Sequence, residues 1–190
     1  MRARPSRPAR PAHASHPPRA PAPGAEPLVG VERVLVDGTN LAFALAGRGA
    51  GAPTPAAGVL ASVRAAFPPA VRVDLVFDGS GDVGIARAGT FARAAQNLFV
   101  EHSGRRSADR VIDEAVEAQL RADGPAGTWG ILVITDDREL RGLVQGRGAR
   151  VAGTAWLAGR LARGIAGPGA TSGRPSGTSI GHRRPPRPAR

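Results

Sequence analysis

The chain has 190 residues, 26 basic side chains against 15 acidic ones, and a formal net charge of +11. This length allows one domain with a real core, and a hydrophobic fraction of 42% is typical of a globular protein. The absence of cysteine excludes disulfides, cysteine nucleophiles and cysteine-based zinc sites. Only four histidines occur, so any metal is expected to bind oxygen ligands, as magnesium and manganese do.

The positive charge is concentrated at the two ends of the chain. Residues 1–27 carry five Arg and one Glu, and residues 164–190 carry five Arg, whereas the part between them holds sixteen Arg and fourteen acids. Both ends are rich in Arg and Pro with little to bury, so we expect disordered tails over 1–27 and 165–190 around a domain at 28–164. Every cation is arginine, which fits a GC-rich genome as well as it fits attraction to RNA phosphates, and both interpretations stay open.

No apolar stretch is long enough to predict a membrane span, and no apolar segment of signal-peptide length follows the first arginines. We therefore expect a cytoplasmic protein that does not enter a membrane.

Apolar runs of strand length alternate with helical patterns between the tails. Continuous apolar runs predict strands at 33–37 and 71–79, with a helix at 56–67 between them. The remaining predicted elements are strand 97–103, helix 107–122, strand 129–135, helix 136–148, strand 149–153 and helix 154–164. This alternation predicts a three-layer α/β domain with a mostly parallel central sheet flanked by helices.

Acidic residues fall where these predicted strands end and where the strongest helix begins. Ligands bind outside the carboxyl ends of the strands in such sheets, so these acids are expected to meet at one edge. Crowded carboxylates repel one another and raise one another's pKa unless a cation lies between them, which points to a divalent metal. The acids concerned are Asp37, Asp78, Asp109, Asp136 and Asp137.

Each of these acids also has a purely structural interpretation. Asp37 and Asp78 each precede a glycine and fit turns. Asp109 could complement a helix dipole. Asp136 fits a capping box with Glu139, which leaves Asp137 unexplained by capping.

Four segments in this order resemble the NYN domain, a branch of the PIN-like nuclease superfamily. They are "VLVDGTN", "LVFDG", "SADRVIDEA" and "VITDDREL", and the resemblance covers about residues 31–160. It implies a PIN-like fold and metal-dependent hydrolysis of RNA by acids at the strand ends. The chain departs from the family pattern at Arg110, where a second acid is common, and at Asp136, where serine is common.

The resemblance also implies roles for individual residues. Asp37, Asp109 and Asp137 are expected to hold Mg²⁺ or Mn²⁺, and Asp113 or Asp136 to position the nucleophile. Residues expected to contact or orient the RNA substrate are Thr39, Asn40, Asp78, Arg105 and Arg106.

Several alternatives compete with a metal-dependent ribonuclease. A haloacid-dehalogenase-like phosphatase needs an aspartate where Leu35 stands, and both it and a P-loop protein need a lysine that the chain lacks. A 5′-nuclease needs more length and a basic arch. A catalytically inactive PIN-like module that binds RNA or joins a complex stays open, as does a homodimer. The aromatic residues, Phe43 among them, fall in apolar patterns and are expected in the core, so no base-stacking platform is predicted.

Overall fold

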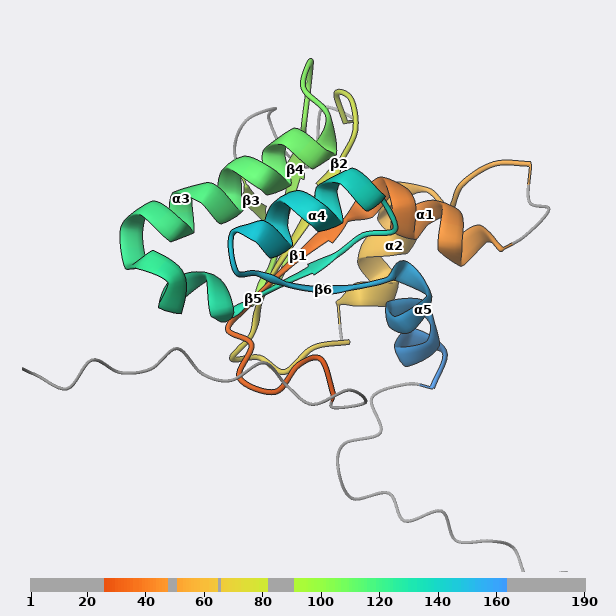
Figure 1. Cartoon of the computed structure of the whole chain (residues 1–190). Coiled ribbons are helices and arrows are strands. Elements are labelled where there is room, and N and C mark those ends of the chain that lie inside the picture. Colours follow the sequence, from red (N-terminus) through yellow and green to blue (C-terminus); the bar gives the residue numbers. More distant parts are fainter. Residues whose placement is uncertain (1–25, 48–50, 65, 82–90, 164–190) are drawn as a thin grey trace, which may run out of the picture.

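The computed structural model describes residues 26–47, 51–64, 66–81 and 91–163 (Figure 1). Except for Glu26 and Pro27, the two tails predicted to be disordered lie outside these residues. The strands are β1 (Arg33–Asp37), β2 (Arg72–Phe77), β3 (Ala92–Arg93), β4 (Leu98–His102), β5 (Ile131–Ile134) and β6 (Arg150–Ala152). The helices are α1 (Gly38–Ala46), α2 (Ala56–Val63), α3 (Ala108–Trp129), α4 (Arg138–Gly146) and α5 (Thr154–Ala162).

The strands form one sheet in the order β3-β4-β2-β1-β5-β6. All pairs are parallel except β3 with β4. β1 lies at the centre, with Asp37 beside Val76 of β2 and Val36 beside Ile134 of β5. The carboxyl ends of β1, β2 and β5 therefore share one edge, and the segments that follow them meet there.

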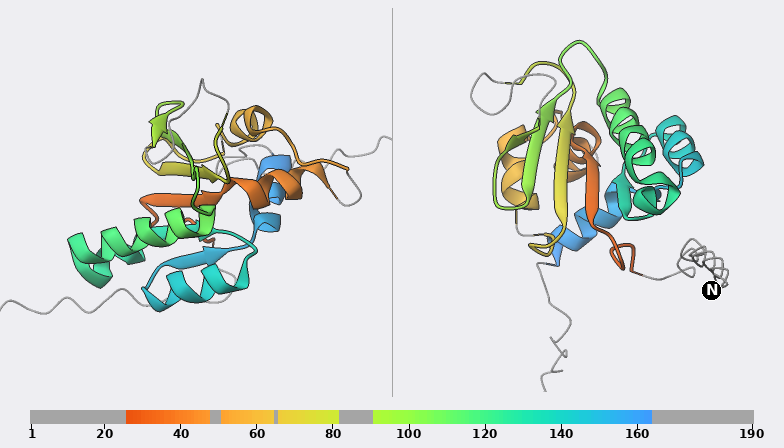
Figure 2. Two further views of the ribbon diagram at one scale, coloured as in Figure 1. Left: turned by 90° about the horizontal axis from the view of Figure 1, so that it is seen from above. Right: turned by 90° about the vertical axis from the view of Figure 1, so that its left-hand side faces the viewer.

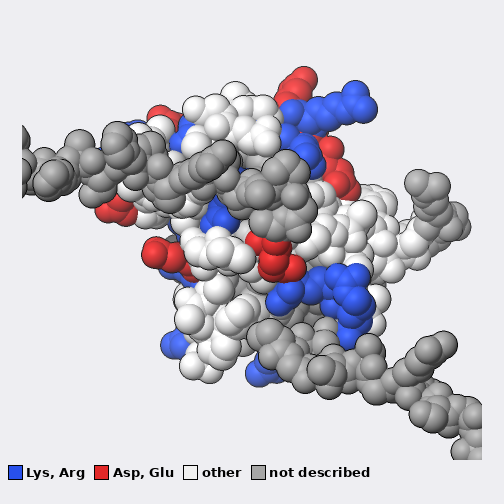
Figure 3. All heavy atoms as spheres, turned by 60° about the horizontal axis from the view of Figure 1, so that its bottom comes forward, with Lys and Arg blue, Asp and Glu red and all other residues white. Residues whose placement is uncertain are grey.

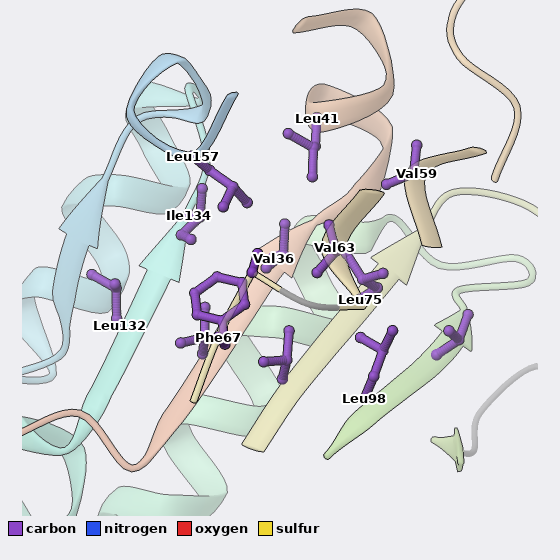
Figure 4. Packing of buried hydrophobic residues seen from close by; sticks show 14 of the residues in the cluster. Val36, Leu41, Val59, Val63, Phe67, Leu75, Leu98, Leu132, Ile134 and Leu157 are labelled. Carbon is purple, nitrogen blue, oxygen red and sulfur yellow. The ribbon is translucent and has the colours of Figure 1, made fainter. Parts of the chain in front are cut away.

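Helices cover both faces of the sheet, which confirms the predicted three-layer α/β architecture (Figure 2). One face packs against α1, α2 and α5, and its core includes Leu41, Val59 and Leu157 (Figure 4). The other face packs against α3 and α4 through Ile112, Val116 and other apolar residues. Because both faces are buried, the central strands are continuous apolar runs rather than alternating ones.

The predicted elements are present, with shifts at their ends. The helix predicted to end at residue 122 is broken nearby at Gly124, whose φ of 67° and ψ of −166° are not helical and suit glycine, and a second helical stretch then continues α3 to Trp129. The predicted strand at 129–135 begins only at Ile131. The short edge strand β3 was not predicted, because two residues carry no readable periodicity.

The two Asp-Gly pairs differ in what their glycines do. Gly79 has a φ of 76°, as expected for a turn. Gly38 is instead the first residue of α1, and a Cβ there would lie 2.7 Å from the Phe77 ring. Gly38 is therefore needed for close packing of α1 on β2 rather than for a turn.

No helix in the described part of the chain is long and apolar enough to cross a membrane. The face shown in Figure 3 carries both arginine and acidic side chains. Ion pairs on the described surface, such as Arg160 with Glu26 at 3.2 Å, join residues far apart in the chain.

Candidate active site at the carboxyl edge of the sheet

Asp37 is the last residue of β1 and the N-cap of α1. Its Oδ1 accepts a hydrogen bond from the Asn40 backbone N–H at 2.9 Å, and its Oδ2 accepts a short one from the Asn40 side-chain amide. Only 3% of its surface is exposed. The sequence places it there because an apolar strand ends directly against a helix whose first N–H groups need an acceptor.

Thr135 connects Asp37 to the segment that follows β5. Its hydroxyl donates to Asp37 Oδ2 at 3.3 Å and accepts from the Asn40 amide at 3.2 Å and from the Asp137 backbone N–H at 3.1 Å. Asp137 is in turn the N-cap of α4, since its Oδ1 accepts from the Leu140 N–H at 2.8 Å. One buried hydroxyl thus fixes the positions of two helix-capping carboxylates.

Asp78 follows β2, which lies on the opposite side of β1 from β5, and Asp109 lies in the first turn of α3. The Asp78 N–H donates to Thr39 Oγ1 at 2.9 Å, and Asp78 Oδ1 accepts from the Ala108 N–H at the start of α3 at 2.7 Å. Asp109 follows in the first turn of α3, after the N-cap Ser107. Its carboxylate makes no hydrogen bond or ion pair with the other described residues.

The carboxylates perturb one another's ionisation. The pKa of Asp37 is raised to about 6, mainly by burial and also by the charges of Asp109 and Asp78, against the lowering effect of the hydrogen bonds from Asn40 and Thr135. Burial also raises the pKa of Asp109, together with the charges of Asp137, Asp78 and Glu139. These acids come from four separate segments of the chain and lie within electrostatic reach of one another.

The other buried acids of the sheet are neutralised by arginine. Asp74 is fully buried and pairs with Arg33 at 2.6 Å and with Arg72 at 2.9 Å. Glu101 is buried and pairs with Arg106 at 3.1 Å. Asp37 has no cationic partner among the described residues. A buried carboxylate without a protein cation is a site where an external cation would be stabilised.

Two of the predicted site residues have other partners in the structure, and a third is exposed to solvent. Asp113 pairs with Arg147 at 2.7 Å and so joins α3 to the end of α4. Arg106 pairs with Glu114 at 2.7 Å as well as with Glu101. Arg105 is exposed.

The capping-box interpretation required Asp136 to cap α4, but Asp137 caps that helix instead. The Oδ1 of Asp136 accepts from the Thr154 N–H at 3.0 Å, and its Oδ2 accepts a short hydrogen bond from the Thr154 hydroxyl, so Asp136 caps α5. The side chains of adjacent residues point in different directions at a strand end. In "TDD" the second aspartate, Asp137, caps the helix that follows directly, α4.

The structure also adds two residues that the sequence analysis did not assign to the site. Thr135 is fully buried and joins Asp37 to Asp137, a role that only the pairing of β1 with β5 reveals. Glu139 acts electrostatically on Asp109, although they are 30 positions apart. The sequence could have indicated Glu139 as a site residue, because it lies two positions after Asp137 in the first turn of α4.

The donor atoms fit magnesium or manganese in chemistry, since they are carboxylate oxygens with one hydroxyl nearby. In the described part of the chain, no three His, Asp or Glu side chains are arranged to hold an ion directly. Mg²⁺ usually keeps several waters and binds through only one or two carboxylates, so this arrangement fits a largely hydrated ion better than a closed protein cage.

No family model matches the chain, and no curated protein matches it. Among solved structures, it is similar to a tryptophan-to-leucine mutant of Rae1 (YacP) from Bacillus subtilis, with 23% sequence identity and a TM-score of 0.49. The match covers 70% of this chain and 76% of that one. The functional argument therefore rests on the site itself.

Proposed function

We propose that the protein is a metal-dependent ribonuclease whose site is formed by Asp37, Asp109 and Asp137. The proposal is supported chiefly by the state of Asp37, which is buried, has a pKa raised to about 6 and lacks a protein cation among the described residues. Capping alone does not account for this, because asparagine or serine caps a helix as well without burying a charge. A carboxylate at position 37, rather than an uncharged cap, is needed if its negative charge binds a cation.

A bound Mg²⁺ or Mn²⁺ would supply an activated water and stabilise charge on the phosphate oxygens. Asp37 at the end of β1 and Asp137 at the start of α4 would hold it, directly or through water, together with Asp109 of α3. Asn40 and Thr135 orient Asp37 through the hydrogen bonds described above. The Asp109 carboxylate makes no hydrogen bond with other described residues, so it is available for a water or a metal.

Metal binding can be tested apart from catalysis by thermal unfolding of the full chain with increasing Mn²⁺ or Mg²⁺. Specific binding raises Tm with metal concentration, because the ion binds the folded state preferentially. Asp37→Asn, Asp109→Asn and Asp137→Asn should each reduce that rise. Asp113→Asn is the matched control, because Asp113 is an acid of the same helix as Asp109 that pairs with Arg147.

Cleavage is tested on single-stranded and structured RNA with the same variants. The ribonuclease proposal requires cleavage that depends on the metal and is lost in Asp37→Asn and Asp137→Asn but kept in Asp113→Asn. RNA binding without cleavage under any metal would favour the inactive binding module instead. Cleavage that persists in both Asp37→Asn and Asp137→Asn would show that another activity is being measured.

A further inference from the structure

Phe43 is an aromatic residue that the structure leaves in solvent, contrary to the expectation that it belongs to the core. Its surface is 58% exposed, although it lies in the middle of α1. The buried residues of α1 are Gly38, Leu41 and Ala42. Because successive residues of a helix are rotated by 100°, Phe43 points away from that buried face. Its side chain points in a direction between those of Thr39 and Asn40, and it lies about one helical turn after them.

Thr39 and Asn40 show where this side of α1 faces. The Thr39 hydroxyl accepts from the Asp78 N–H at 2.9 Å, and the Asn40 amide donates to Asp37 and, at 3.2 Å, to Thr135. Both residues therefore contact the edge of the sheet that carries the candidate site. Phe43 continues the same side of the helix, about 9 Å along the axis from Asp37 at 1.5 Å per residue.

The described contacts give Phe43 no structural role that would explain an aromatic ring. It takes part in none of the ring stacking or cation–π contacts among the described residues, whereas Phe77 stacks on His102, and Phe99 lies under Arg72. An exposed ring beside a site is suited to binding a flat partner, since base–aromatic stacking tolerates every base.

We propose that Phe43 stacks on an unpaired base of the RNA strand whose phosphate lies at the acidic site. This inference rests on the proposed function for the identity of the ligand. A base in a duplex is already stacked and paired, so it cannot lie on a side chain, whereas bases of single strands and loops can. If the arginines of the tails attract RNA, they would attract any strand through its phosphate charge, whereas stacking at Phe43 would fix the register of the strand.

The test uses the full chain without divalent metal and a single-stranded oligoribonucleotide that carries 2-aminopurine at one position at a time. Stacking quenches the fluorescence of this base analogue, so one position in the register should be quenched on binding. Phe43→Leu keeps an apolar side chain without the ring. It should weaken binding roughly 5- to 150-fold and abolish the position-specific quenching. Phe43→Trp should retain both.

Val29→Ala is the matched control, because Val29 is 66% exposed and precedes the amino end of β1, away from the site edge. It should bind as the unaltered chain does. Unchanged affinity and quenching in Phe43→Leu, equal affinity for a duplex, or no binding of single strands would each overturn the inference. Quenching that depends on Phe43 in a chain that never cleaves RNA would support it while defeating the ribonuclease proposal.

Discussion

The Thr135 hydroxyl donates to Asp37 Oδ2 at 3.3 Å, although 98 positions separate the two residues. The parallel pairing of β1 with β5 brings them together, since Val36 lies beside Ile134 one residue earlier. The same hydroxyl accepts from the Asp137 N–H, so two of the proposed metal-binding acids depend on one side chain.

Thr135→Val should destabilise the fold and raise the Asp37 pKa further. Valine fills the space but leaves the half-buried Asp137 N–H and Asn40 amide without this acceptor, at about 1 kcal/mol for each hydrogen bond lost. The hydrogen bond from Thr135 lowers the Asp37 pKa, so its loss removes that effect. Denaturant unfolding and a carboxyl NMR titration measure the two effects. Thr135→Ser keeps the hydroxyl and should resemble the unaltered chain; equal losses in both variants would contradict this account.

Asp37→Asn should stabilise the metal-free protein at neutral pH. The Asp37 pKa is raised from 3.8 to about 6 on folding, so its contribution to stability is fully present below pH 3.8 and is lost as pH rises through 6. Asparagine carries no charge and still caps α1, so at pH 7.5 the variant should be more stable by on the order of 1–3 kcal/mol.

The pH dependence provides the control for that gain. The difference in unfolding free energy between the two proteins should shrink between pH 6 and pH 4 and vanish where Asp37 is protonated in both states. A constant difference across this range would mean that the asparagine acts by some route other than charge burial. Saturating Mn²⁺ should reverse the order at pH 7.5, because only the unaltered chain gains the full stabilisation by metal.

Asp136→Ala should reduce stability while leaving metal binding intact. Asp136 caps α5 through both the N–H and the hydroxyl of Thr154, and loss of a helix cap typically removes about 1 kcal/mol. Its neighbour Asp137 is the paired comparison, since Asp137→Asn keeps the α4 cap but should remove most of the rise in Tm with Mn²⁺. If Asp136→Ala lost as much of the rise in Tm with Mn²⁺ as Asp137→Asn does, Asp136 would have to be a metal-binding residue as well.

Gly38→Ala should be destabilising although Gly38 lies in a helix, where alanine is normally favoured. The added Cβ would lie 2.7 Å from the Phe77 ring, which is itself stacked on His102, and overpacking of this kind typically removes about 1–3 kcal/mol. Phe77→Leu in the same chain should recover part of the loss in thermal unfolding. A stable Gly38→Ala protein would mean that the ring moves freely.

Much of the fold follows from local patterns along the chain. Continuous apolar runs marked β1, β2 and β5 because these strands are buried on both faces, and the apolar stripe of α3 marked the strongest helix. Their order, with helices between successive strands, required parallel pairing. Parallel pairing in turn requires that Asp37, Asp78 and Asp137, which follow these strands, lie at one edge of the sheet.

The sequence by itself determined the layers, the order of the elements and the edge at which the acids gather. These features follow from the spacing of apolar residues and from the order of strands and helices, and both are local properties of the chain. The tertiary structure alone decided which acid serves which purpose. Asp136 turns to α5 and Asp113 to Arg147, whereas Asp37 is buried without a cation among the described residues. It also left Phe43 exposed, because the "LAFALA" run of α1 is apolar on every side, and only packing selects the side that is covered.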